Sequence, residues 1–192
     1  MEELSVLLSQ LSCGEDEQAE AALSHLASWG PQAIEALQQR LSNPEAEVRW
    51  WAVRALAELT DERVPGLLVG ALGDPDKGVR WCAGLALRKH PSPQAIGALL
   101  GMLEDAEALT RRLAGDALAA IGAEAVPPLL EVLQQGEQPA RVEAVRALAK
   151  IGDQRAIPAL FEALDDNSAL IEYWASEGLE KMGVGMVFYK PE

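Results

Sequence analysis

The chain has 192 residues, of which 49% are hydrophobic, so it is long enough and apolar enough to fold around a substantial core. Its formal net charge of −14 argues against a broad nucleic-acid surface or an anionic membrane as a partner. No apolar run approaches the length of a membrane span, and the start Met-Glu-Glu-Leu lacks the basic and apolar segments of a secretory signal. We therefore expect a cytoplasmic protein with reduced cysteines.

The charge is unevenly distributed along the chain. Residues 1–61 hold 11 acids and 3 bases, residues 62–122 hold 7 of each, and residues 123–192 hold 12 acids and 6 bases. The centre is therefore locally richer in cations than either end. Arg outnumbers Lys 11 to 5, and Ala and Leu are abundant, which is typical of a GC-rich bacterial genome.

A nine-residue phrase recurs roughly every 31 residues along the chain. Its five copies read VRWWAVRAL, VRWCAGLAL, TRRLAGDAL, ARVEAVRAL and IEYWASEGL, and they begin at Val48, Val79, Thr110, Ala140 and Ile171. A fixed period of this size predicts stacked repeats, which build long binding surfaces.

We divide the chain into one solenoid domain, 1–192, with an N-terminal capping unit, 1–30, and a C-terminal tail, 185–192. The full repeats between them are 31–61, 62–92, 93–122, 123–153 and 154–184. Each repeat opens with a short helix A, whose apolar residues recur at the spacing of one helix face, as in residues 33–41. Helix B follows and carries the recurring phrase. The tail is apolar, and we expect it to fold back over the last repeat; docking elsewhere is the alternative.

Turn and cap residues mark the repeat boundaries. Three prolines fall at one equivalent position inside the first turn of helix A, where the missing N–H costs nothing: Pro65, Pro127 and Pro158. Polar residues fall together in the turn between helices A and B: Asn43, Asp74, Asp105 and Asp166. Helix B ends in Ile-Gly at Gly122 and Gly152, and glycine suits a left-handed position there.

This pattern resembles the HEAT-like repeat family, in the short form first associated with phycobilisome lyases. The resemblance covers nearly the whole chain. It implies an all-α fold, a right-handed α-solenoid of stacked two-helix repeats (an α–α superhelix). It also implies that the A helices lie on the convex face and the B helices on the concave face.

Two letters of the phrase are nearly constant. An arginine recurs at its second position, and it could form an anion-binding ladder or bond internally to turn carbonyls and to an Asp of the neighbouring repeat: Arg49, Arg80, Arg111 and Arg141. We favour the internal ladder, because the planar guanidinium suits partly buried pairing. A small residue recurs at the fifth position, which lets helices approach closely: Ala52, Ala83, Ala114, Ala144 and Ala175.

The resemblance implies that the third, fourth and seventh letters of the phrase point into the concave groove. The candidate partner-binding residues are therefore Trp50, Trp51, Arg54, Trp81, Cys82, Leu85, Arg112, Leu113, Asp116, Val142, Glu143, Arg146, Tyr173, Trp174 and Glu177. Trp, Tyr and Arg dominate binding hot spots, so a set that holds four of the five tryptophans indicates an interaction site. The alternative is that the tryptophans pack between helices. Because adjacent helical residues such as Trp50 and Trp51 lie about 100° apart, we expect at least half of the set to reach solvent.

Two residues raise the question of catalysis. His90 could be a ligand or a base, but we interpret it as a satisfied core histidine at the end of a helix. Cys82 could be a nucleophile, but it has no histidine near it in sequence to activate it, so a buried apolar cysteine is the better interpretation. We find no phosphate-binding glycine motif, zinc spacing or hydrolase elbow.

The resemblance also supplies an enzyme to compare. Deoxyhypusine hydroxylase, a branch of this fold, binds two irons with His-Glu pairs directly after the arginine. Here those positions hold Trp-Trp, Trp-Cys, Arg-Leu, Val-Glu and Tyr-Trp, so we exclude that activity and predict no metal site. DNA glycosylases with HEAT-like repeats rely on a basic groove, which an acidic chain does not offer.

Three functions remain open. The leading hypothesis is a non-catalytic scaffold that holds a protein or peptide in a Trp-lined groove and needs no cofactor. The second is a bilin lyase-like protein that binds an open-chain tetrapyrrole, with Arg112 and Lys77 pairing its propionates, and that works as one half of a heterodimer. The third is a structural homodimer that buries the groove.

Overall fold

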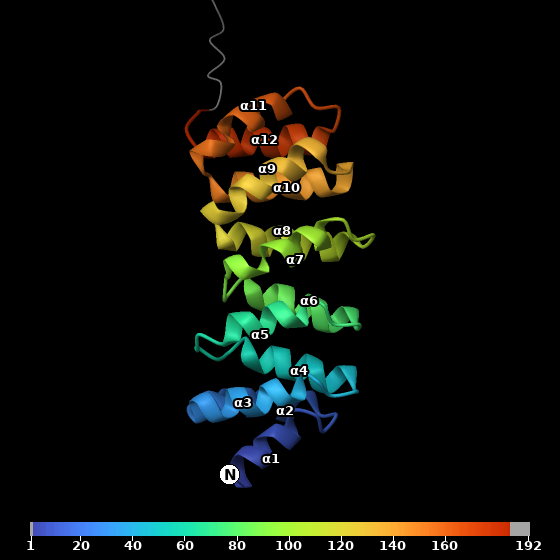
Figure 1. The fold of residues 1–192 in the computed structure, drawn as a ribbon, viewed down its shortest axis with the longest axis vertical. Coiled ribbons are helices and arrows are strands. Elements are labelled where there is room, and N and C mark those ends of the chain that lie inside the picture. The colour runs from blue at the N-terminus through green and yellow to red at the C-terminus, as the bar shows by residue number, and fades with distance from the viewer. Residues whose placement is uncertain (1, 185–192) are drawn as a thin grey trace, which may run out of the picture. The chain divides into compact units, whose positions relative to one another are not determined.

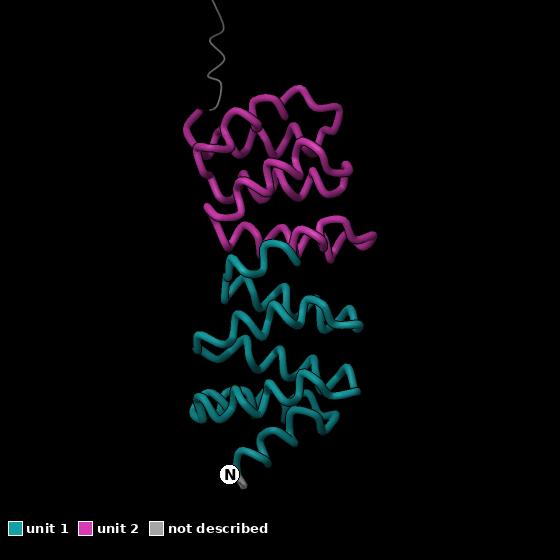
Figure 2. Tube along the Cα trace, in the orientation of Figure 1, with its two compact units in different colours: residues 1–98 teal, residues 99–192 magenta. Residues whose placement is uncertain are grey.

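The computed structural model describes residues 2–184, and within that range it contains helices and no strand. Figure 1 shows the helices, and Figure 2 shows the two compact units into which the chain divides, residues 1–98 and 99–192. The all-α prediction is confirmed. The prediction for the tail, 185–192, lies outside the described residues.

Unit 1 begins with the pair α1 (Glu2–Gln10) and α2 (Asp16–Leu26). Two repeats follow, made of α3 (Gly30–Arg40) with α4 (Ala46–Leu56) and of α5 (Val64–Ala71) with α6 (Lys77–Leu87). Helix α7 (Ile96–Leu103) spans the boundary between the units. Within unit 1 the B helices α4 and α6 pack on each other, and each also packs on the A helix of its own repeat.

Unit 2 continues with α8 (Ala108–Ile121), then α9 (Val126–Gln135) with α10 (Gln138–Ile151), and ends with α11 (Ile157–Ala163) and α12 (Ala169–Lys181). Helix α10 packs on α8 and on α12, so the B helices again form one layer. Within the described range of both units, short 3₁₀ turns lead into four of the A helices, at Ala27–Trp29, Pro93–Ala95, Ala123–Ala125 and Gln154–Ala156. Each predicted repeat therefore contains one A helix and one B helix.

The core of each unit is built from leucine and alanine. The recurring alanine of helix B has no exposed surface in any repeat, as the small-residue pattern predicted: Ala52, Ala83, Ala114, Ala144 and Ala175. Pro65, Pro127 and Pro158 lie in the first turn of their A helices, also as predicted. No single helix in the described range is long and apolar enough to cross a membrane; α8 and the segment Ala123–Gln135 reach that composition only together, with a 118° bend between them.

The polar turn residues perform the role expected of them. In each turn the side chain accepts a hydrogen bond from the backbone N–H two residues later, at 2.8–2.9 Å, for Asn43, Asp74, Asp105 and Asp166. This contact stabilises the chain reversal between helices A and B. The helix-ending glycines differ from one another: Gly152 is left-handed (φ 68°, ψ 30°), whereas Gly122 combines φ 83° with ψ −134°. Both have the positive φ that favours glycine.

The recurring arginines form the predicted internal ladder. Arg49, Arg80 and Arg111 each donate from Nη1 to two carbonyls of the turn that precedes their helix, at 2.7–3.0 Å. Arg49 also donates to Asp74 of the next repeat, and Arg141 pairs with Asp166 in the same way. The guanidinium groups therefore hold turn to helix and repeat to repeat.

His90 is hydrogen-bonded within the fold, as predicted, but it does not lie in the core. Its side chain is half-buried, and Nε2 lies 2.9 Å from the carbonyl oxygen of Ala57, at the end of helix α4. One ring nitrogen therefore donates to an otherwise open helix carbonyl.

Candidate functional site

Each unit has a candidate site on the exposed side of its own B helices, which we call the B-helix face of that unit. Of the predicted groove residues, those that reach solvent in full or in part are Trp50, Arg54, Trp81 and Leu85 in unit 1, and Arg112, Asp116, Val142, Glu143, Tyr173, Trp174 and Glu177 in unit 2. The expectation that at least half of the set reaches solvent is confirmed.

Four predicted groove residues are buried instead, so their assignment to a partner-binding surface was wrong. Trp51, Cys82 and Leu113, at the fourth letter of the phrase, are 5%, 7% and 6% exposed. In α4, α6 and α8 the rotation of about 100° per residue directs this position into the packing between helices and leaves the third letter outside, whereas the fourth-letter residues of α10 and α12, Glu143 and Trp174, are half-buried. Arg146 is fully buried for a different reason, because two carboxylates and a carbonyl surround its guanidinium.

Aromatic rings dominate the B-helix face of unit 1. The ring of Trp50 meets that of the buried Trp51 edge to face, with centroids 4.9 Å apart, so the exposed ring rests on a fixed one. On the next B helix, Trp81 is half-buried, and the ammonium of Lys77 lies 5.2 Å from its ring centroid. Leu85, one turn further along α6, is 50% exposed. Two half-exposed indoles and a leucine therefore share adjacent helices.

The charges beside these rings are paired with one another. Arg54 donates to Glu58 at 2.5 Å and lies 3.4 Å from Glu20, while Lys89 lies 2.7 Å from Glu58. The hydrogen bond from Lys89, together with that from Arg54, lowers the pKa of the Glu58 carboxyl. The guanidinium of Arg54 is thus paired with carboxylates of the chain itself.

Cys82 lacks the properties of a nucleophile. Its side chain is buried, and burial raises its pKa to about 11, against a weak opposing influence of Arg54. A thiol of that pKa is almost wholly protonated at neutral pH, and the thiolate is the reactive form. The interpretation as a buried apolar cysteine is confirmed by its position.

A four-charge cluster lies at the centre of the B-helix face of unit 2. Arg146 of α10 donates from Nε to Glu143 at 2.6 Å and from Nη1 to Asp116 of α8 at 2.6 Å. Its Nη2 donates to the carbonyl oxygen of Arg112 at 3.0 Å, and Lys150 donates to Asp116 at 2.6 Å. The two cations and two carboxylates neutralise one another. A buried charge is tolerated when it is paired and hydrogen-bonded in this way.

The cluster depends on a glycine and on its own hydrogen bonds. A Cβ on Gly115 would lie 3.0 Å from Nη2 of Arg146, so glycine leaves the space that the guanidinium occupies. Burial by itself raises the pKa of Asp116, but the hydrogen bonds from Lys150 and Arg146 outweigh it, and the net effect lowers that pKa. Asp116 therefore stays ionised and holds α8 to α10.

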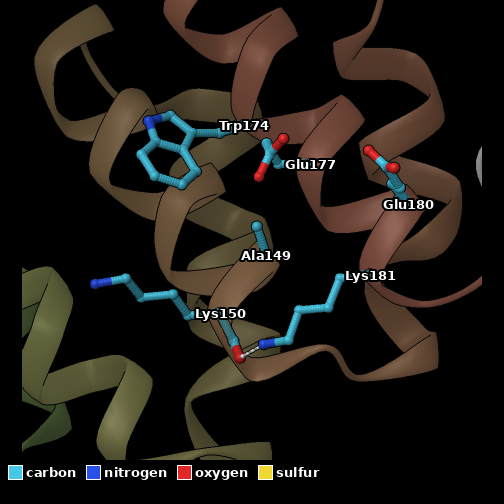
Figure 3. A pocket seen from close by; sticks show the side chains of 6 residues that line it. All are labelled: Ala149, Lys150, Trp174, Glu177, Glu180 and Lys181. Carbon is cyan, nitrogen blue, oxygen red and sulfur yellow. Dashed lines mark hydrogen bonds between the residues drawn. The ribbon is translucent and has the colours of Figure 1, made fainter.

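Helix α12 carries an aromatic pair similar to that of α4. The rings of Tyr173 and Trp174 meet edge to face with centroids 5.1 Å apart, and Tyr173 is 53% exposed. Beside them, between α10 and α12, lies a hollow of 410 Å³, shown in Figure 3. Its lining residues are Ala149, Lys150, Trp174, Glu177, Glu180 and Lys181.

Sequence reasoning missed both the cluster and part of the hollow. Lys150, Glu180 and Lys181 were absent from the predicted groove. The spacings were visible, because Glu143 and Arg146 are three residues apart on one helix, and Asp116 and Arg146 fall at the same letter of successive phrases. Within the described residues no group of three His, Cys, Asp or Glu side chains is placed to hold a metal ion.

Comparison with known proteins adds relatives for this fold. The pattern of HEAT repeats matches residues 4–87 and 126–184, and that of the PBS lyase HEAT-like repeat matches residues 110–135. The phycocyanobilin lyase subunit beta of Pseudanabaena tenuis is 43% identical over 68 residues, which are 35% of this chain and 24% of that subunit.

Solved structures resemble the chain over most of its length. One chain in the structure of the complex of CpcE and CpcF of phycocyanin lyase from Nostoc sp. is similar at 22% identity and a TM-score of 0.60. The match covers 75% of this chain and 96% of the matched chain. A designed armadillo repeat protein in complex with the peptide (KR)4 is also similar, at 22% identity and a TM-score of 0.55. The match covers 94% of this chain and 99% of the designed protein. Human deoxyhypusine hydroxylase is similar at 25% identity and a TM-score of 0.54, and the match covers 94% of this chain and 73% of the hydroxylase chain. Because the HEAT repeat pattern covers more than half of its residues, the chain belongs to the HEAT repeat proteins.

Proposed function

We propose that this protein is a non-catalytic binding module that holds a protein or peptide partner on its B-helix face. The observation that carries the proposal is the placement of Trp50 and Trp81 in unit 1 and of Tyr173 in unit 2. Each of these rings is partly or largely exposed, and two of them rest edge to face on a neighbouring ring. Aromatic side chains of this kind lose little conformational entropy on binding and dominate hot spots.

The pairing of charges supports an apolar rather than an anionic partner surface. Arg54 and the fully buried Arg146 bond to carboxylates of the chain itself. The arginine ladder is bonded to turn carbonyls. These guanidinium groups have little capacity left for a phosphate or a nucleic acid, and the net charge of −14 opposes both.

The relatives also support a binding role. CpcE and CpcF are seen together in one complex, and the designed armadillo repeat protein is seen with a peptide. Stacked helical repeats bind partners along extended surfaces. The high pKa of Cys82 and the lack of His-Glu pairs after the recurring arginine give no support to catalysis.

Affinity capture from extract of the native cells tests the proposal. Wild-type protein is compared with Trp50→Ala/Trp81→Ala and with Phe161→Ala, which removes an exposed aromatic ring from an A helix. The B-helix face is supported as the binding surface if wild type and the Phe161 variant enrich a partner that the double variant loses. The circular dichroism spectrum of the double variant must be unchanged. Equal enrichment by all three proteins contradicts it.

The second candidate function is the handling of an open-chain tetrapyrrole. The identity of 43% over 68 residues with a phycocyanobilin lyase subunit favours it, as does the exposed guanidinium of Arg112, which could pair with a propionate. Mixing the protein with phycocyanobilin tests this function. A shift of the bilin absorbance that Arg112→Ala weakens supports it, and an unchanged spectrum argues against it.

A further inference from the structure

The hollow between α10 and α12 differs from two other hollows in the described part of the chain. Two smaller ones, of 310 and 230 Å³, lie between successive A helices, one in each unit, and each lies over an Arg–Asp pair that joins two repeats. Their equivalence shows that they are a product of repeat packing. The hollow in Figure 3 lies on the B-helix face and is lined by an indole, two lysines and two glutamates.

The two lysines of this hollow are already bonded. Lys150 donates to Asp116 at 2.6 Å. Lys181 donates to the backbone carbonyl oxygen of Lys150 at 2.6 Å, as the dashed line in Figure 3 shows, and so caps the end of α10. Both ammonium groups are therefore held at contacts within the fold.

The two glutamates are not bonded in this way. Glu177 and Glu180 are exposed, and neither carboxylate forms a hydrogen bond or ion pair within the described part of the chain. Together with Trp174 they follow one another at intervals of three residues along α12, which places all three on one side of the helix. The equivalent positions on α8 and α10 are Asp116 with Ala119 and Arg146 with Ala149. This combination is therefore specific to the last repeat.

We propose that this hollow binds an arginine side chain of the protein partner. The carboxylate of Glu177 would accept hydrogen bonds from the guanidinium, whose plane would stack on the neighbouring ring of Trp174, and the carboxylate of Glu180 would add a negative charge on the other side of Glu177. Arginine suits the site better than lysine, because its planar group both forks onto carboxylates and stacks on aromatic faces. The net charge of −6 on residues 123–192 attracts a basic segment.

The inference rests on the proposed function, and it adds that one contact residue of the partner is an arginine. Exposed aromatic rings lie next to the hollow, since Tyr173 contacts Trp174. The fitting partner therefore presents an apolar side chain close to an arginine. Such a partner would use the aromatic rings for affinity and the hollow for orientation.

A simple probe tests the hollow without knowledge of the partner. The probe is the peptide acetyl-Arg-Arg-Arg-amide, with acetyl-Glu-Glu-Glu-amide as its opposite. The readout is the indole N–H resonance of Trp174 in ¹⁵N-labelled protein, assigned by its loss in Trp174→Phe. We expect a saturable shift with the arginine peptide and none with the glutamate peptide. Glu177→Gln/Glu180→Gln should weaken the apparent affinity by about fivefold, since the ion pair with Glu177 and the nearby charge of Glu180 are lost.

The matched control is Glu124→Gln/Glu131→Gln, which makes the same change of net charge at two other exposed glutamates of unit 2. We expect its affinity within about twofold of wild type. No shift of Trp174, or an equal loss in both double variants, would overturn the inference. Loss of partner capture in the Trp50→Ala/Trp81→Ala experiment is independent of this result, so failure of the hollow and failure of the proposed function are distinguishable.

Discussion

Arg146 and Asp116 join two consecutive B helices across 30 residues of chain. Nη1 of Arg146 lies 2.6 Å from Oδ1 of Asp116, and the arginine side chain has no exposed surface. The same guanidinium also holds Glu143 and the carbonyl of Arg112. One side chain thus satisfies three acceptors in the middle of unit 2.

Replacement of Arg146 by methionine should destabilise the protein strongly. Methionine fills a similar volume but leaves Asp116 and Glu143 without their buried partner, which costs about 3 kcal/mol in the free energy of unfolding. Lys150→Met is the matched control, because Lys150 bonds the same carboxylate but is 42% exposed, and it should cost below about 1 kcal/mol. Urea denaturation followed by circular dichroism measures both. Equal effects would show that burial does not set the strength of the cluster.

The pair Arg49–Asp74 should make stability depend on acid pH. The hydrogen bonds from Arg49 lower the pKa of the Asp74 carboxyl in the folded protein, and the unfolded chain keeps a value of about 4. The stabilisation is therefore present above about pH 4 and is lost as pH falls through the lower, folded pKa. We expect the urea midpoint to fall less between pH 6 and pH 3 in Asp74→Asn than in wild type. In the exposed-site control Asp165→Asn, the urea midpoint should fall as much as in wild type. An equal fall of the midpoint in all three proteins would exclude a contribution of Asp74 to the pH dependence.

Two helical glycines should respond with opposite sign to the same substitution. A Cβ on Gly178 would lie 2.9 Å from Cβ and 3.0 Å from Cα of Ala149, so Gly178→Ala should force α10 and α12 apart and cost about 1–3 kcal/mol. A Cβ on Gly66 of α5 would meet no neighbouring atom within 4 Å, so Gly66→Ala should gain about 0.5–1 kcal/mol from helix propensity. Thermal melting of the two variants checks the signs. An unchanged or raised melting temperature in Gly178→Ala would contradict the close packing of α12 on α10.

The two cysteines should react at very different rates. Cys13 is exposed, whereas Cys82 is buried and its pKa is raised to about 11. A thiol-specific chromogenic reagent at about pH 8 should modify one thiol of the native protein quickly and the second only after addition of denaturant. Cys13→Ser should abolish the fast phase. A fast phase that remains in that variant would reopen Cys82 as a reactive group.

The sequence was sufficient to predict what the repeat itself imposes. The arginine ladder, the buried alanines and the polar turn residues recur at fixed letters of the phrase, so periodicity alone placed them. Periodicity could not decide which of Trp50 and Trp51 faces out, because that depends on the rotation of α4 against its neighbours. Nor could it show that Arg146 is buried, since its environment needs Asp116 on another helix and the space left by Gly115.

The most direct test of a partner-binding B-helix face compares two exposed aromatic residues of one repeat. Tyr173 lies on the B-helix face of α12 and is 53% exposed, and Phe161 lies on α11 and is 40% exposed. The affinity of the captured partner is measured by isothermal titration calorimetry for Tyr173→Ala and Phe161→Ala, with melting temperatures as the folding control. We expect Tyr173→Ala to weaken binding by about tenfold or more and Phe161→Ala to change it by less than about twofold. Equal affinities for the two variants, or a larger loss with Phe161→Ala, would contradict a partner on the B-helix face.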